Sequence, residues 1–189
     1  MTVIKSTNVL EREHEAIHRV IAAVSITAEK LDADEPFDFG ILLDFSAFLH
    51  DFSEAHHHAK EERLLFPLLE AKGVPASGCP IAVLHHEHEK GRALLKQLDD
   101  AIQVFLTTGA AKEDLTQTLR SMVQLYVDHM WKEDYLLLPM ANKVLSDEDQ
   151  AALCDQFESL EQELGSAKYR EMEQLSRTLD PTHVRGDAK

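Results

Sequence analysis

The sequence predicts an all-α protein: an up-down-up-down bundle of four helices, followed by one further helix near the C-terminus. Apolar residues recur at spacings of three and four, and no stretch shows the sustained alternation of a strand. The 7 Gly and 6 Pro residues gather mainly at 36–40, 73–80 and Gly109, which are the expected loops. Because loops this short favour antiparallel packing of successive helices, the bundle is expected to run up and down.

The helices of the bundle are expected near residues 8–33, 38–71, 80–107 and 111–145. Each carries an apolar stripe on one face; the first consists of Leu10, Ile17, Ile21 and Val24. Asn8, with Glu11 three residues later, resembles a helix start. Pro67 and Pro139 are expected to bend or end the second and fourth helices.

Residues 146–180 are predicted to form the additional C-terminal helix. Ser146 and Asp149 form a second start signal, and an apolar stripe follows at Leu153, Phe157, Leu160 and Leu164. This helix is expected to pack on the bundle as a structural element or lid, or to form a contact in a homodimer. The whole chain, 1–189, is then one domain with its bundle at 8–145.

Composition excludes several classes of protein. The chain has 34 Asp and Glu against 19 Lys and Arg, a net charge of −15, which disfavours binding to nucleic acid or to anionic membranes. No apolar run reaches the roughly 20 residues of a membrane span, and residues 1–8 contain no secretory signal. Two cysteines, Cys79 and Cys154, form no disulfide framework, so the expected location is cytoplasmic.

Two segments of the chain recur at nearly one offset. Residues 57–67 (HHAKEERLLFP) match 129–139 (HMWKEDYLLLP) at an offset of 72, and residues 10–15 (LEREHE) match 84–89 (LHHEHE) at an offset of 74. The simplest account is a duplicated helical hairpin, in which each half contributes two helices to an approximately two-fold symmetric bundle.

The repeated residues favour a metal site with two ions. On a helix, positions i and i+4 share a face, so a histidine and a glutamate at that spacing can reach one metal. Adding the repeated histidines of the first and third helices gives the candidate ligands His14, His57, Glu61, His88, His129 and Glu133. Each carboxylate can bridge two ions, and without a cation the buried polar groups would be costly to desolvate.

Other residues on these helices are assigned less closely. His18 and His85 are expected to be either further ligands or hydrogen-bond donors near the ligands, and Glu54 can at most contact a ligand. Tyr126, three residues before His129, belongs to the core or approaches the metals. His58 lies next to a ligand and shares part of its face, but is expected outside the ligand set. The other histidines are expected at the rim, surface, periphery or tail: His50, His56, His86 and His183.

The pattern His14, His57-x-x-x-Glu61, His88, His129-x-x-x-Glu133 resembles the bacterial branch of the hemerythrin-like (HHE cation-binding) family over residues 8–145. The resemblance implies a non-haem di-iron centre whose two ions are bridged by the carboxylates and by an oxo or hydroxo group. Nitrogen and oxygen ligands also suit manganese or zinc, so the choice of iron rests on the resemblance.

The chain departs from the oxygen-carrying members of that family. They have a further histidine four residues before the one matching His88, where this chain has Leu84. They also have an aspartate five residues after the helix-four histidine; Asp134 occupies that place, but the adjacent Glu133 fits the internal repeat better. These departures argue against reversible O2 transport as the sole role.

The expected function is therefore that of a di-iron protein that interacts with O2, NO or peroxide in sensing, storage or detoxification. An enzyme is the main alternative, for peroxide disproportionation or iron–sulfur cluster repair, although the sequence identifies no catalytic residue. A ferritin-like iron oxidase or store needs Glu-x-x-His on facing helices, and the fourth helix has Tyr126 where that glutamate would be. A purely structural bundle leaves the repeated histidines and glutamates unexplained.

Overall fold

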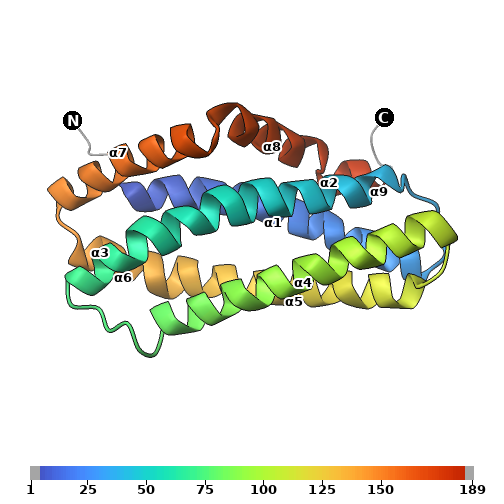
Figure 1. Ribbon diagram of the computed structural model, residues 1–189, viewed down its shortest axis with the longest axis horizontal. Helices are drawn as coiled ribbons and strands as arrows, with labels where there is room; N and C mark the ends of the chain where they lie inside the picture. The colour runs from blue at the N-terminus through green and yellow to red at the C-terminus, as the bar shows by residue number, and fades with distance from the viewer. Residues whose placement is uncertain (1–4, 186–189) are drawn as a thin grey trace.

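The computed structural model of the chain describes residues 5–185, apart from the side chains of His183 and Arg185. These residues form helices and connecting turns without strands, and four long helices pack side by side in an up-down-up-down bundle (Figure 1). The predicted fold class is confirmed. None of the helices in the described part of the chain combines the length and apolar character that a membrane span requires.

Two helices of the bundle are regular α-helices: α1 (Ser6–Asp32) and α4 (Ile81–Thr108). The second long helix is built in succession from α2 (Gly40–Phe48), π-helical η1 (Leu49–His58), π-helical η2 (Glu61–Leu65) and α3 (Phe66–Ala71). The fourth consists of α5 (Lys112–Lys132), π-helical η3 (Glu133–Leu137) and α6 (Leu138–Val144). All eight ends lie within two residues of the predicted ones.

The predicted start of the first helix at Asn8 is wrong, because α1 begins at Ser6. The backbone N–H and the hydroxyl of Ser6 both donate to Gln150 Oε1, at 2.9 and 2.6 Å. A side chain from a distant part of the chain thus accepts the N–H that a local cap would otherwise satisfy. Asn8 lies inside the helix, where its amide donates to Glu11.

The two prolines follow wide turns and do not end their helices. Phe66 N–H donates to Glu61 O, and Leu138 N–H donates to Glu133 O, so each π-helical turn closes just before Pro67 or Pro139. Because proline lacks an N–H and crowds the carbonyl of an ordinary α-helical turn, the wider turn lets the chain continue past it.

The C-terminal region forms helices along the outside of the bundle, where one helix over 146–180 is predicted. Helix α7 (Asp147–Leu164) begins with the predicted capping box, in which Ser146 and Asp149 bond each other's backbone N–H. Gly165, at φ 111°, separates it from α8 (Ser166–Thr178), and α9 (Pro181–Arg185) follows. Figure 1 shows α7 and α8 running over α1 and the second long helix, away from α4 and α5.

The buried apolar side chains form two clusters, one toward each end of the bundle. One cluster includes Val24, Phe45, Leu98, Leu119 and Met172. The other includes Leu69, Ile81, Leu138, Leu153 and Phe157. Between the two clusters lies a layer of buried polar side chains, which contains all six candidate ligands.

Candidate metal centre

Four buried imidazoles turn their Nε2 atoms toward the middle of the polar layer. The Nε2 atoms of His14 and His57 lie 3.2 Å apart, and so do those of His88 and His129. Each pair therefore joins neighbouring helices: α1 with η1, and α4 with α5. The two pairs correspond to the two halves of the internal repeat.

The carboxylates of Glu61 and Glu133 lie between these pairs. Glu133 Oε2 is 3.1 Å from His14 Nε2, and its Oε1 is 3.0 Å from His129 Nε2. Glu61 Oε2 lies 3.4 Å from His88 Nε2 and 3.9 Å from His57 Nε2. Each carboxylate thus reaches both halves, as a bridging ligand must.

These two carboxylates depend on nearby positive charge rather than on well-formed hydrogen bonds. Both residues are fully buried, and among the described residues none of their four oxygens has a hydrogen-bond partner of acceptable geometry. Burial of an ionised carboxylate without compensation is costly, and cations beside the oxygens would remove that cost. The donor set of imidazole nitrogens and carboxylate oxygens suits a first-row transition metal.

A second ring of carboxylates fixes the orientation of the imidazoles. Each Nδ1–H donates to one of them: His14 to Asp134 (2.6 Å), His57 to Glu13 (3.0 Å), His88 to Glu62 (2.7 Å) and His129 to Glu87 (3.2 Å). Since Nδ1 keeps its proton in the hydrogen bond to the outer carboxylate, Nε2 is the ring nitrogen that can bind a metal in place of its own proton. None of these four residues was predicted to contact a ligand, yet the repeat contains them, because Glu13 matches Glu87 and Glu62 matches Asp134.

The outer carboxylates stay ionised. Burial opposes ionisation of Glu13, but hydrogen bonds and charge from His57 and Lys60 outweigh it and lower its pKa to about 2. The hydrogen bond from His88 is the main cause that lowers the pKa of Glu62 to about 2.

The inner imidazoles hold protons strongly when no cation is present. Burial alone would lower the pKa of His14, but the hydrogen bond to Asp134 and the nearby Glu133 carboxylate raise it to about 10. Burial also acts to lower the pKa of His129 and His88, but the nearby Glu133 carboxylate outweighs it. The pKa is raised to about 9 for His129 and to about 11 for His88. A site that attracts protons this strongly is also one that attracts metal cations.

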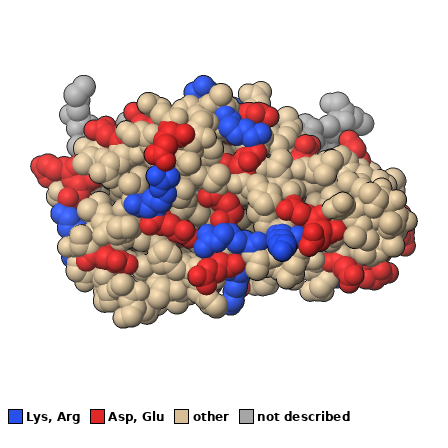
Figure 2. Space-filling model, in the orientation of Figure 1, with Lys and Arg blue, Asp and Glu red and all other residues tan. Residues whose placement is uncertain are grey.

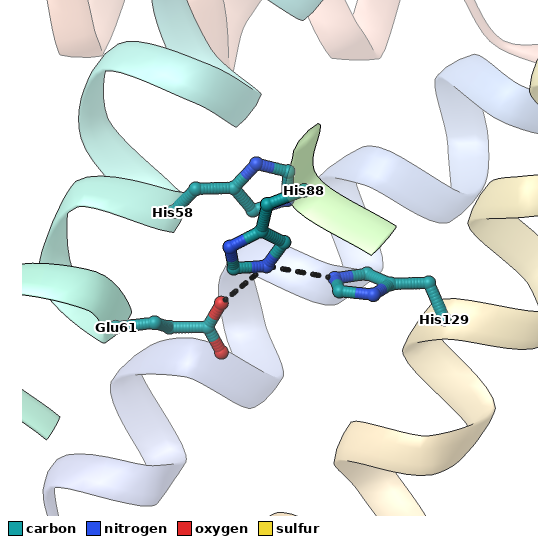
Figure 3. A group of neighbouring side chains, drawn as sticks. All are labelled: His58, Glu61, His88 and His129. Carbon is teal, nitrogen blue, oxygen red and sulfur yellow. Dashed lines mark hydrogen bonds and ion pairs between the residues drawn. The ribbon is translucent and has the colours of Figure 1, made fainter. Parts of the chain in front are cut away.

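His58 lies closer to the centre than the sequence indicates. Its ring is buried and stacks on that of His88 with 3.9 Å between centroids (Figure 3), and its Nδ1–H donates to Glu54 Oε1 at 2.8 Å. Figure 3 shows His58 and Glu61 on the second long helix, facing His88 and His129. Two groups with ligand atoms within 4.8 Å of one another result: His14, His57, Glu61 and Glu133, and His58, Glu61, His88 and His129.

The residues that the sequence left as possible further ligands, His18, His85 and Tyr126, belong to neither of these groups. His18 is half exposed, with its Nε2 3.9 Å from the Asp134 carboxylate. His85 packs edge-on against the ring of Phe66. Tyr126 is buried and shares a hydrogen bond of 2.9 Å with Ser53.

The remaining histidines differ in burial. His50 and His86 are exposed, as expected. The prediction of a rim or surface position for His56 is wrong, because η1 turns it inward and its Nδ1–H donates to Asp51 O. His183, expected in the tail, has a side chain outside the described part of the structure.

A small cavity reaches one half of the layer. Its volume is about 10 Å³, which is room for roughly one water molecule. It is lined by His58, Glu87, His88, Gly91, Leu125, Tyr126 and His129. The lining thus includes the second pair of imidazoles and neither His14 nor His57.

Comparisons with known proteins agree with this geometry. A family model described as the hemerythrin HHE cation binding domain matches residues 5–141, which confirms the resemblance. An uncharacterised protein of Mycobacterium tuberculosis is 26% identical over 157 residues, covering 80% of this chain and 59% of its own length; one of Mycobacterium bovis matches equally. The iron-sulfur cluster repair protein YtfE of Musicola paradisiaca is 28% identical over 141 residues, covering 70% and 62%.

The chain thus spans about three fifths of the length of these relatives. No solved structure matches the chain at a significant level.

Proposed function

The chain belongs to the hemerythrin HHE cation-binding family, and we propose that it holds two iron ions and interacts there with O2, NO or peroxide. One observation carries this proposal: two fully buried carboxylates, whose oxygens have no well-formed hydrogen bond within the described part of the chain, lie between two pairs of imidazoles. Six side chains with this arrangement satisfy two cations better than one, because each ion then has its own imidazole pair and shares both carboxylates.

Each group of residues would have its own role within this site. His14 and His57 would hold one ion, His88 and His129 the other, and Glu61 and Glu133 would link them. When bound, iron supplies the redox chemistry that O2, NO and peroxide require. The outer carboxylates keep each Nδ1 protonated, and the apolar clusters on both sides exclude bulk water from the layer.

The size of the cavity limits which molecules can interact with the site. A cavity this small excludes organic substrates and leaves O2, NO and peroxide as the candidate ligands nearest to it in size. This favours sensing, storage or detoxification of such small molecules over chemistry on a metabolite.

Metal analysis combined with spectroscopy tests the proposal. We expect about two iron ions per chain, and absorption changes when the reduced protein meets O2, NO or H2O2. One zinc per chain with no spectral change on reduction would contradict the proposal.

The bridging role is tested by the double variant Glu61→Ala/Glu133→Ala, which we expect to lose most of the bound metal. A matched control is Glu70→Ala/Glu89→Ala, which removes two exposed carboxylates from the same bundle and should keep both ions. Retention of two ions by the first variant would show that the bridging assignment is wrong.

Iron–sulfur cluster repair is the second candidate, favoured by the similarity to the repair protein of Musicola paradisiaca. If the chain acts in repair, the iron-loaded protein should restore activity to an oxidant-damaged iron–sulfur enzyme, and the Glu61→Ala/Glu133→Ala variant should not. Equal recovery with free ferrous iron alone would remove this candidate.

A further inference from the structure

The two halves of the polar layer differ in how deeply their outer glutamate and the lysine beside it are buried. The repeat gives each half a lysine beside its outer glutamate: Lys60 with Glu13, and Lys132 with Glu87. Both members of the first pair are 1% exposed, whereas Lys132 is 23% exposed and Glu87 is 13% exposed. Two segments of similar sequence have therefore been placed in different environments.

Helix α8 contributes to this difference through Tyr169. The Tyr169 hydroxyl donates to Glu13 Oε1 at 3.0 Å, and the face of its ring lies 4.6 Å from Lys60 Nζ. The ring also stacks on Phe52 at 5.1 Å between centroids, which fixes its position. Tyr169 thus covers the lysine and the glutamate together.

A single residue then connects α8 to the inner ring of imidazoles. Glu13 accepts from Tyr169 and Lys60 at Oε1 and from His57 Nδ1–H at Oε2. In the other half, Glu87 accepts from His129 and Lys132, and no described residue of α7 or α8 contributes to that arrangement.

We propose that Tyr169 is a positioning residue through which α8 makes the His14–His57 half the tighter of two unequal metal sites. The His88–His129 half is then the one that releases its ion more readily and that small ligands reach. The inference rests on the proposed pair of ions and goes beyond it by distinguishing between them. Two independent features agree: the buried bond network lies on the first half, and the small cavity opens onto the second.

The physical reason lies in the hydrogen bonds around His57. Partners in the second layer orient a ligand and raise its basicity, and their loss typically costs 10–100-fold in metal affinity. Hydrogen bonds in a water-free environment are stronger than exposed ones. Glu87 is partly hydrated, so the corresponding bond to His129 gains less.

Half-site variants test the proposal directly. His88→Ala/His129→Ala retains the first imidazole pair, and His14→Ala/His57→Ala retains the second; each is titrated with Co²⁺ while visible absorption is followed. Adding Tyr169→Phe should raise the Kd for Co²⁺ by roughly 10-fold in the first background. In the second background the Kd should stay within about twofold. Equal weakening in both backgrounds, or in neither, would overturn the proposal.

A second measurement covers the case in which a half-site variant does not fold. The chain with all six ligands is loaded with Co²⁺, and release of the ions to excess chelator is followed over time. We expect two phases, of which Tyr169→Phe accelerates only the slower, by roughly 10-fold. A single phase in the parent chain, or equal acceleration of both phases, would overturn the proposal.

Tyr135→Phe is the matched control. Tyr135 is 67% exposed, so the same chemical change there should leave both titrations and both release phases unchanged. Binding of fewer than two ions by the parent chain would be a failure of the proposed function, whereas two ions with no effect of Tyr169→Phe would refute this inference alone.

Discussion

Each of the four candidate ligand histidines has different surroundings at its two ring nitrogens. Nδ1 is occupied by a carboxylate of the outer ring, and Nε2 is thereby left for the centre. The chain therefore fixes the orientation of all four imidazoles before any cation binds, which lowers the reorganisation that binding requires. The same principle applies to His58, whose Nδ1–H donates to Glu54.

We predict that His58 provides a third imidazole to the ion held by His88 and His129. That ion still remains the more weakly held of the two, because the outer carboxylate of its half, Glu87, is partly exposed. The ring of His58 belongs to the second ligand group, and the corresponding position in the other half of the repeat is Met130, which offers no nitrogen. His58→Ala should weaken the binding of one of the two ions by roughly 10-fold or more, as measured by Co²⁺ titration.

His56→Ala is the control for this variant. His56 is also buried and lies on the same helix, but it belongs to neither ligand group. Unchanged affinity for both ions in His58→Ala would show that this residue only packs against His88.

Gly91 lines the cavity. A Cβ at this position would lie 3.7 Å from Glu54 Oε1 and from Leu125, an ordinary contact distance, so alanine should fit without strain. The two additional methyl groups of valine would project into a space of about 10 Å³. We predict that Gly91→Val slows binding of NO to the iron-loaded protein by roughly an order of magnitude or more. The rate of NO binding reports how easily a small molecule reaches the site.

The rate is measured by stopped-flow absorption, with Gly91→Ala as the control. If Gly91→Val binds NO at the parent rate with both ions present, small molecules enter by another route.

At the scale of whole elements, the sequence predicted the helices better than their local winding. The spacing of apolar residues placed all four helices within two residues, because burial of one face imposes that spacing. It did not predict the π-helical segments at the ligands, since these depend on hydrogen bonds to the fifth residue rather than the fourth.

The winding explains why His58 was expected outside the site. In an α-helix it would be turned about 100° from His57. In the wider π-helical turn of η1 the rotation per residue is smaller, so both rings can face the layer. The repeat does not indicate His58 as a candidate ligand either, because its other half has Met130 at the matching position.

Gly165 determines how the C-terminal segment follows the bundle. Its φ of 111° and ψ of 86° allow α7 to end and α8 to begin at a new angle, so that Tyr169 reaches Glu13. A residue with a Cβ is strained in this conformation. We predict that Gly165→Ala lowers the free energy of unfolding by about 1–3 kcal/mol, measured by urea denaturation of the metal-free protein.

Gly91→Ala again offers a comparison, because it adds the same methyl group at a helical position without positive φ. There the free energy of unfolding should rise by about 0.5–1 kcal/mol. Equal effects at the two positions would mean that the conformation of Gly165 imposes no strain.

For the molecule as a whole, the net charge of −15 proved a weak guide to the site. Figure 2 shows acidic side chains spread over the visible face, with Lys and Arg residues among them. The acids that matter are buried or half-buried, and their positions follow from the repeat: Glu61 and Glu133 in the inner ring and four more around them. Composition indicated bound cations, but only the matching of the two halves identified the candidate ligands.

The protons held by the imidazoles predict how the stability of the metal-free protein depends on pH. The pKa values of His129, His14 and His88 are raised to about 9, 10 and 11, against about 6.5 in an unfolded chain. Between these values the folded state binds more protons than the unfolded state, so stability falls as pH rises. The contribution is fully present below about pH 6.5 and is lost through pH 9–11, which urea denaturation at pH 6, 8 and 10 should show.

Metal uptake should reverse this dependence, because cations replace the protons on the same Nε2 atoms. At pH 8 each of these three histidines is protonated in the metal-free protein, and loading both ions should therefore release about three protons per chain. An indicator dye in weak buffer measures the release, and the Glu70→Ala/Glu89→Ala variant should match the parent chain. Loading without proton release would mean that the ions bind elsewhere, since ions at these nitrogens cannot coexist with the protons.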